Sequence, residues 1–185
     1  MPKTVRLYLV RHGEATSKWT EADDPGLSDL GRAQANGAAS LLSAFGPLPV
    51  KSSPLLRARE TAAPLSARWK SSVDIIPAVS EIPSPGIERA ERQRWLLQVM
   101  AGGWGAAGGE LLDWRAGLIE TLQAQKEDCV IFSHFVAINA AVGAASGIDD
   151  VISFRPDNGS ITILETDGGA LHLIERGREA ETAVR

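Results

Sequence analysis

Short apolar runs alternate along the chain with longer segments in which apolar residues recur every three or four positions. The short runs have the length and β-branched content of strands, and the longer segments have the periodicity of helices with one buried face. Strands are expected at Val5–Val10, Leu48–Ser52, Val73–Ile76 and Cys129–Phe132, with a closing hairpin of Ile161–Leu164 and Leu171–Ile174. Helices are expected at Asp29–Ala44, Leu55–Arg68, Glu88–Met100, Glu110–Gln125 and Val136–Ala145. This alternation predicts an α/β fold around a mostly parallel sheet.

Residues that commonly begin or end helices support these boundaries. Ser28 is placed to cap the first helix, and Pro54 lies in the opening turn of the second. The glycine-rich segment Gly102–Gly109 is expected to be a flexible linker. Its Gly103–Gly108 portion matches G-x-G-x-x-G, but it lies between two helices and follows no strand, so a nucleotide site is not expected there.

The length and composition are those of one ordinary globular domain. The chain has 185 residues, of which 44% are hydrophobic and 23% charged. We expect a single domain over residues 1–176 and a polar tail over residues 177–185, with the chain frayed from Arg176 to Arg185. Trp95, Trp104 and Trp114 fall in the helical region, where core packing is a commoner role for tryptophan than lining a substrate cap.

Charge and cysteine content exclude several classes of partner. The net charge of −4 gives no bulk attraction to nucleic acid or to an anionic membrane, so neither is expected as a partner. The long apolar region Val130–Ile148 is interrupted by Ser133, His134 and Asn139 and is interpreted as a strand and a buried helix, not as a membrane span. No secretory signal is visible, and a single cysteine, Cys129, is compatible with a reducing compartment. We therefore expect a cytoplasmic protein.

Only three histidines occur, and two of them follow predicted strands. His12 comes after the first strand and His134 after the strand Cys129–Phe132, where parallel sheets place functional residues. His172 alternates with leucines in the last hairpin and is expected to face solvent.

The residues around His12 and His134 have the chemistry of a phosphate site. Arg11 beside His12 supplies a guanidinium for phosphate oxygens and an imidazole nucleophile, and Arg57 in the first turn of its helix can reach the same sheet edge. His134 precedes a helix whose free N–H groups are expected to attract an anion. Each feature also has a simpler interpretation: a surface Arg-His pair, a solvated helix charge at Arg57, or a core histidine at His134. Together they favour phosphoryl transfer.

Four motifs in order resemble the signatures of the histidine phosphatase superfamily, which includes the cofactor-dependent phosphoglycerate mutases. They are Leu9-Val10-Arg11-His12-Gly13-Glu14, Leu27-Ser28-Asp29-Leu30-Gly31-Arg32-Ala33-Gln34-Ala35, Ser52-Ser53-Pro54-Leu55-Leu56-Arg57-Ala58-Arg59-Glu60-Thr61-Ala62 and Val130-Ile131-Phe132-Ser133-His134. The resemblance spans most of the chain. It implies a three-layer α/β/α sandwich of the phosphoglycerate mutase type.

The same resemblance implies roles for individual residues. His12 would be the nucleophile that forms a phosphohistidine, Arg11 and Arg57 would bind phosphoryl oxygens, and His134 would complete the pocket and share in both phosphate binding and catalysis. Glu81 resembles the acid that protonates the leaving group, with Glu88 and Glu91 as competitors. No cofactor is implied, and neither a paired-cysteine nor an H-E-x-x-H pattern occurs, so no metal is expected.

Three departures from the family pattern bear on activity. Phe135 stands where the family usually has glycine, and Lys18 stands where many members have asparagine. The short stretch Glu81–Arg92 favours a phosphatase over a mutase. We therefore expect hydrolysis of a small phosphomonoester or of a phosphohistidine on another protein. The alternatives are a mutase-type phosphotransferase and a phosphate- or phosphopeptide-binding module without turnover; the sequence does not indicate the oligomeric state.

Overall fold

The computed structural model describes residues 3–18 and 21–181. Its strands are β1 (Val5–Arg11), β2 (Val50–Ser52), β3 (Val73–Ile75), β4 (Cys129–Ser133), β5 (Ile161–Thr166) and β6 (Leu171–Glu175). Its α-helices are α1 (Asp29–Leu42), α2 (Leu56–Trp69), α3 (Arg92–Met100), α4 (Gly109–Gln123) and α5 (Phe135–Ser146). Within this part of the chain, no helix has the length and apolar character needed to cross a bilayer.

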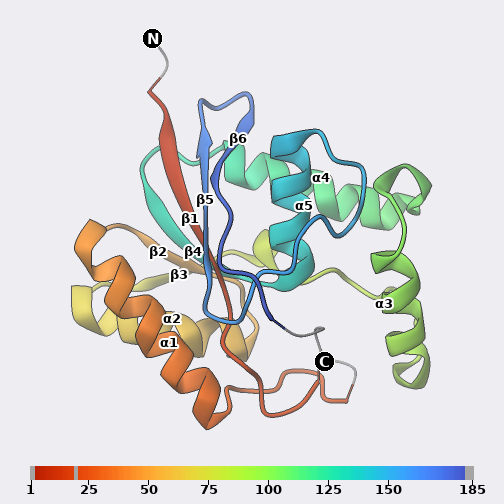
Figure 1. Cartoon of the computed structure of the whole chain (residues 1–185), viewed down its shortest axis with the longest axis horizontal. Coiled ribbons are helices and arrows are strands. Elements are labelled where there is room, and N and C mark those ends of the chain that lie inside the picture. Colours follow the sequence, from red (N-terminus) through yellow and green to blue (C-terminus); the bar gives the residue numbers. More distant parts are fainter. Residues whose placement is uncertain (1–2, 19–20, 182–185) are drawn as a thin grey trace.

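The six strands form one sheet in the order β3-β2-β4-β1-β5-β6. Strands β3, β2, β4 and β1 run parallel, whereas β5 and β6 are added antiparallel as the closing hairpin. The α/β fold with a mostly parallel sheet is therefore confirmed. In Figure 1, α1 and α2 cover one face of the sheet and α4 and α5 the other, while α3 lies at the periphery.

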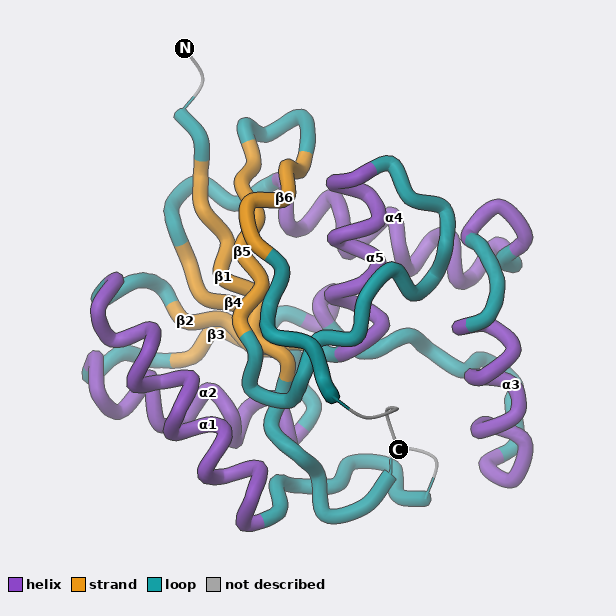
Figure 2. The backbone as a smooth tube through the Cα atoms, viewed as in Figure 1, coloured by secondary structure: helices purple, strands orange, loops and turns teal. Residues whose placement is uncertain are grey.

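Two hydrophobic cores make the three layers. Along β1, Leu7 and Leu9 pack with residues of α4 and α5, whereas Tyr8 and Val10 pack with residues of α1 and α2. This alternation follows from the two-residue period of a strand that is buried on both faces. Figure 2 shows the resulting sandwich, with the strands between two groups of helices.

Two expected segments differ from the structure. The helix expected from Glu88 instead has a 3₁₀ turn at Arg89–Glu91, and α3 begins only at Arg92. The segment Gly102–Gly109 is not a flexible linker, because it contains the 3₁₀ turn Trp104–Ala106. Trp104 is buried in the core, and its backbone N–H donates to the carbonyl of Asp149 at 2.8 Å, which holds the segment in place. Core packing is thus the role of Trp104, and it does not line the cavity described below.

The polar end of the chain is held more firmly than expected. Glu179 forms a β-bridge with Pro156, and the Asp157 N–H donates to the carbonyl of Arg178 at 2.8 Å. The Arg178 guanidinium also lies 2.8 Å from the Asp157 carboxylate. The frayed end predicted from Arg176 onward is therefore wrong for residues 177–180, because backbone pairing and an ion pair attach them to the loop before β5. Residues 182–185 lie outside the described residues.

Candidate active site

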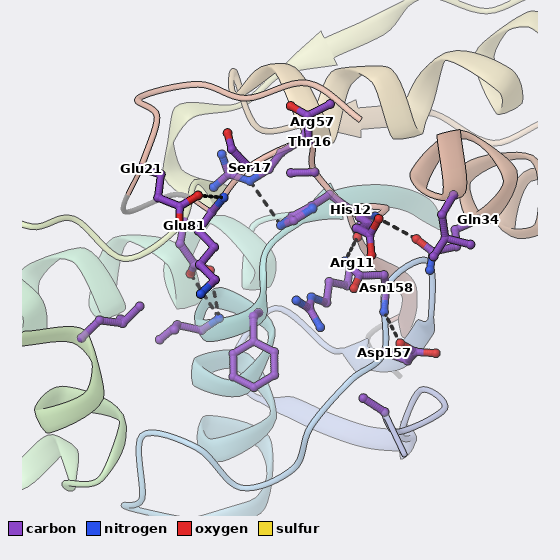
Figure 3. A pocket seen from close by; sticks show the side chains of 18 of the residues that line it. Arg11, His12, Thr16, Ser17, Glu21, Gln34, Arg57, Glu81, Asp157 and Asn158 are labelled. Carbon is purple, nitrogen blue, oxygen red and sulfur yellow. Dashed lines mark hydrogen bonds between the residues drawn. The ribbon is translucent and has the colours of Figure 1, made fainter. Parts of the chain in front are cut away.

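The predicted functional residues meet at the carboxyl ends of three neighbouring strands. His12 follows β1 and His134 follows β4, while Arg57 lies in the first turn of α2, which follows β2. The backbone ladder continues past the strands, since the His12 N–H donates to Ser133 O and the Ser53 N–H to Phe132 O, each at 3.0 Å. Parallel pairing of β1, β4 and β2 therefore brings the three side chains together (Figure 3).

His12 is held as a neutral imidazole with one ring nitrogen free of a proton. Its Nδ1 lies 2.7 Å from the Gly13 carbonyl, to which it donates, and its Nε2 accepts from Nε of Arg57 at 3.2 Å. Burial, followed by the charges of Arg57 and Arg11, lowers the pKa of His12 well below its ordinary value. The structure thus fixes the tautomer through a local backbone carbonyl, as a nucleophilic Nε2 requires.

Two buried arginines flank this imidazole with unused donors. Arg11 donates from Nη1 to the Pro156 carbonyl at 2.8 Å, while its Nε and the Nη1 of Arg57 have no hydrogen-bond partner among the described residues. Burial lowers the pKa of Arg11 to about 10, and burial also lowers the pKa of Arg57. Buried donors without acceptors are costly, so an anion with several oxygens would satisfy this pair.

Phe135 lines the cavity and contacts Arg11. The Arg11 guanidinium carbon lies 4.9 Å from the centre of the Phe135 ring, within the range of a cation–π contact. The Phe135 ring therefore packs against the guanidinium group of Arg11. Lys18, the other departure from the family pattern, is exposed at the cavity wall.

His134 lies beside His12 but is fully buried and does not line the cavity. The two ring centres are 5.2 Å apart. Nε2 of His134 is 2.7 Å from Oγ of Ser53, which already accepts the Leu55 N–H. The Ser53 hydroxyl can therefore donate to Nε2, leaving the proton of neutral His134 on Nδ1, which has no partner among the described residues. Burial and the neighbouring His12, Arg57 and Arg11 lower the pKa of His134 well below its ordinary value.

Glu81 occupies the position expected for an anion at the start of α5. Its Oε1 accepts the N–H groups of Val136 at 3.1 Å and Ala137 at 3.2 Å, and also the N–H of Ile82 at 3.0 Å. The helix N-terminus was expected to attract the phosphate, and this prediction is wrong for these two N–H groups because a carboxylate of the chain itself already binds them. Burial raises the pKa of Glu81 in spite of these contacts.

A cavity of about 700 Å³ opens over these groups. Arg11, His12, Arg57 and Glu81 line its base (Figure 3), whereas the competing acids Glu88 and Glu91 are exposed and do not line it. His172 is also exposed, as expected. Among the described residues, no group of three or more His, Cys, Asp and Glu side chains is arranged to hold a metal ion.

Two supporting contacts were not foreseen from the sequence. The Asn158 side-chain amide donates to the His12 carbonyl at 2.8 Å, and the Thr61 hydroxyl accepts the Gly13 N–H at 3.0 Å. Thr61 is part of the third motif, whereas Asn158 belongs to none of the four motifs. The Asn-Gly dipeptide, which is typical of turns, was the one signal in the sequence. In the structure Gly159 has a φ of +72°, and its N–H donates to the Arg11 carbonyl at 2.9 Å.

The second motif is explained by a close backbone approach. A Cβ atom at Gly13 would collide with the carbonyl of Gly31, and a Cβ at Gly31 would collide with the carbonyl of Glu14. The first turn of α1, capped by the Ser28 hydroxyl, therefore packs directly on the loop that carries His12.

The sequence also matches a model of a known protein family. The model, described as "Histidine phosphatase superfamily (branch 1)", matches residues 7–177.

The chain belongs to the histidine phosphatase superfamily. It is 35% identical over 112 residues to an uncharacterized protein of Mycobacterium tuberculosis, covering 53% of this chain and 55% of that protein. It is 43% identical over 74 residues to the glucosyl-3-phosphoglycerate phosphatase of Mycolicibacterium vanbaalenii, covering 38% of this chain and 33% of that protein. The matched region thus spans about half or less of these curated relatives.

The fold of this superfamily member is also that of solved structures. A mycobacterial glucosyl-3-phosphoglycerate phosphatase superposes with a TM-score of 0.70 at 23% identity, over 97% of this chain and 100% of that chain. At this identity the likeness shows the phosphoglycerate mutase-like three-layer fold.

Proposed function

We propose that this superfamily member hydrolyses phosphomonoesters through a phosphohistidine formed on Nε2 of His12. The observation that carries the proposal is the arrangement at that nitrogen. Its lone pair faces the Arg57 guanidinium, its partner nitrogen is tied to the Gly13 carbonyl, and two buried arginines offer unused donors. This is the geometry that an attacking imidazole and a transferring phosphoryl group require.

In the first step, Nε2 of His12 attacks phosphorus and the bond to the ester oxygen breaks. Arg11 and Arg57 hold the non-bridging oxygens and offset their charge. The raised pKa of Glu81 favours its acid form, which gives its proton to the departing oxygen, so the alcohol leaves neutral. The Val136 and Ala137 N–H groups stabilise the carboxylate that remains.

In the second step, water attacks the phosphohistidine. Glu81, now a carboxylate, takes a proton from the water, the P–N bond breaks, and inorganic phosphate departs with His12 neutral again. His134 remains uncharged beside His12, with its proton on the buried Nδ1. Each residue thereby returns to its starting state.

The substrate is a phosphorylated small molecule, which agrees with the phosphatases named among its relatives, or a phosphohistidine on a protein. We further propose that the activity is cytoplasmic and uses no cofactor, in line with the single cysteine and the residues of the site. Release is favoured over mutase-type transfer by the short segment between Glu81 and α3.

Phosphate release from a panel of phosphomonoesters and phosphohistidine peptides tests the proposal. The wild type and His172→Ala should release phosphate, whereas His12→Ala should not. Equal inactivity of the wild type and His12→Ala, with phosphate still bound, would favour a binding module. Transfer to a second hydroxyl without release would identify a mutase-type phosphotransferase.

A further inference from the structure

The outer wall of the cavity is apolar on the side of α3. Leu96, Leu97 and Met100 line it from one stripe of that helix, a stripe that begins with the polar Gln93, since positions three or four apart share a helix face. Leu30 of α1 and Phe135 of α5 line it from other directions. Leu97 is 60% exposed and Leu30 is 54% exposed, so both leucines face water when the cavity holds no ligand.

Large apolar side chains gathered at the mouth of a cavity mark a binding surface. On α3, Leu96 and Met100 are partly buried against the core, whereas Leu97 is exposed. All three line the same cavity as Arg11, His12 and Arg57. An ester whose phosphoryl group is bound at the base therefore has this apolar wall within the same cavity for its organic part.

The charged groups of the rim restrict that organic part. Beyond Arg11, Arg57 and Glu81, the described lining residues include three acids, Glu14, Glu21 and Asp157, and one base, Lys18. Asp157 is paired with Arg178, but Glu14 and Glu21 are exposed at the opening. A second anionic group on the substrate would meet a net negative rim and an apolar wall.

We propose that the preferred substrates are phosphomonoesters with an apolar, uncharged leaving group, aryl or alkyl, which lies against Leu96, Leu97 and Met100. This inference rests on the phosphatase activity proposed above and specifies its substrate class. Leu97 is the specificity-determining residue, because it is the most exposed of the three and lies on the face of α3 that meets the cavity.

Paired esters test the preference with little change in leaving-group chemistry. 1-Naphthyl phosphate and phenyl phosphate differ mainly in apolar area. We expect kcat/KM to be about tenfold higher for the naphthyl ester, which is the low end of the discrimination that additional apolar contact gives. Hexyl phosphate should likewise be preferred to 3-phosphoglycerate, which carries an additional carboxylate.

The matched variants are Leu97→Lys and Leu41→Lys. Leu41 is 65% exposed on α1 and does not line the cavity, so it controls for a new lysine on a helix surface. Leu97→Lys should remove the naphthyl preference and raise kcat/KM for 3-phosphoglycerate relative to hexyl phosphate, whereas Leu41→Lys should match the wild type.

The outcomes separate this inference from the phosphatase proposal. If the wild type hydrolyses both aryl esters with equal kcat/KM, prefers 3-phosphoglycerate, or responds identically to both lysine variants, the substrate class is wrong and the phosphatase activity stands. If the wild type releases phosphate from none of the esters, the phosphatase proposal fails and the substrate class fails with it.

Discussion

The Arg57 side chain is bonded to the nitrogen that would attack phosphorus. Its Nε lies 3.2 Å from Nε2 of His12 while its Nη1 remains unpaired among the described residues. Arg57 thus keeps Nε2 free of a proton before substrate arrives. When a phosphoryl group enters, the same guanidinium can exchange the imidazole for phosphate oxygens, which are stronger acceptors.

Substituting Arg57 by alanine should therefore reduce turnover severely. We expect kcat/KM to fall by about 10²–10³-fold, as for removal of one donor to a transition-state oxygen, with partial recovery in Arg57→Lys. Arg59→Ala, which removes an exposed arginine of the same helix, is the control. Steady-state phosphate release measures both, and unchanged turnover in Arg57→Ala would return Arg57 to the class of structural charges.

Glu81 has two tasks that one substitution can separate. Glu81→Gln keeps an oxygen that accepts the Val136 and Ala137 N–H groups but has no acidic proton. We expect the variant to fold normally and to lose about 10²–10⁴-fold in kcat with alkyl phosphates. The loss should be much smaller with 4-nitrophenyl phosphate, whose leaving group needs little protonation.

An equal loss with both esters in Glu81→Gln would contradict the role of proton donor. Glu81→Ala provides the comparison, because it also removes the acceptor from the start of α5 and should lower the melting temperature. Circular dichroism of the three proteins distinguishes a misfolded site from one that lacks only the acid.

At the level of residues, the sequence predicted the groups that belong to contiguous motifs. Arg11, His12 and Arg57 follow strands or begin a helix, so strand order alone brings them together. The occupation of the α5 N-terminus by Glu81 was missed, because it depends on the path of an irregular loop between distant elements. Asn158 was missed for the same reason, since its contact joins positions far apart in the chain.

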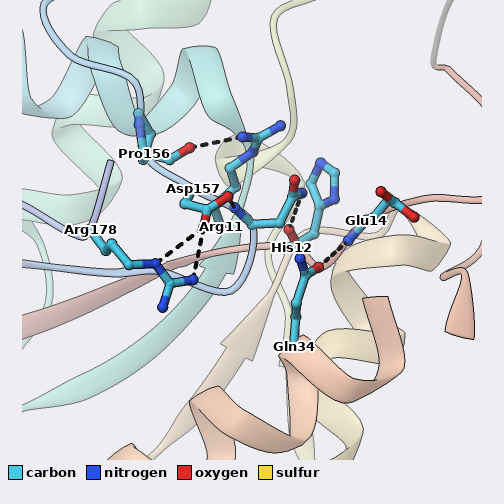
Figure 4. Close-up of polar contacts among 8 residues, drawn as sticks. Arg11, His12, Glu14, Gln34, Pro156, Asp157 and Arg178 are labelled. Carbon is cyan, nitrogen blue, oxygen red and sulfur yellow. Dashed lines mark hydrogen bonds and ion pairs between the residues drawn. The ribbon is translucent and has the colours of Figure 1, made fainter. Parts of the chain in front are cut away.

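The element that holds Arg11 in place is the loop before β5, together with the C-terminal segment. The Pro156 carbonyl accepts from Arg11, and the next residue, Asp157, is bonded to Arg178 by both backbone and side chain (Figure 4). Residues 177–180 therefore fix the loop that holds Arg11, the arginine proposed to bind phosphate, although they lie outside the four motifs.

Loss of the ion pair between Arg178 and Asp157 should weaken substrate binding more than it slows the chemical step. Arg178 is a positioning residue, and its exposed ion pair with Asp157 contributes at most about 1 kcal/mol. We expect Arg178→Ala to raise KM roughly threefold to fivefold with kcat nearly unchanged, and Arg178→Lys to restore most of the effect. Arg68→Ala, at the exposed end of α2, is the control. A fall in kcat with unchanged KM would assign Arg178 a different role.

Elements with strong periodicity were predicted closely, and irregular segments were not. α1 begins after the Ser28 cap, and β5 and β6 form the expected hairpin. The start of α3 and the order of Gly102–Gly109 were missed, because a 3₁₀ turn and a buried tryptophan fix these segments through contacts with other parts of the chain. Local composition does not report such contacts.

For the whole molecule, the sandwich that assembles the site also buries its titratable groups. His12 and His134 are buried at the carboxyl ends of β1 and β4, and both have lowered pKa values. Between these values and the ordinary pKa near 6.5, the unfolded chain binds more protons than the folded one, so stability falls as pH falls below about 6.5. Activity should not decline at pH 6.5 as it would for a histidine of ordinary pKa.

The stability effect can be assigned to His12 by urea unfolding at several pH values. The free energy of unfolding of the wild type should fall with decreasing pH more steeply than that of His12→Asn. The difference in slope should be about 0.7 kcal/mol per pH unit at pH 6.5, where the unfolded histidine is half protonated, and should approach about 1.4 kcal/mol per pH unit about one unit lower. Glu81 titrates in both proteins and cancels in the difference. His172→Asn should keep the wild-type slope, because His172 is exposed. Identical slopes for the wild type and His12→Asn would contradict the neutral, buried state of His12.

The central claim is that His12 carries the phosphoryl group during turnover. Rapid quenching after exposure to a labelled phosphodonor, followed by peptide mapping, measures this directly. We expect one acid-labile, base-stable label on the peptide that contains His12, absent in His12→Asn and present in His172→Asn. A label that persists in His12→Asn, or hydrolysis by the wild type with no labelled histidine on any time scale of turnover, would contradict it.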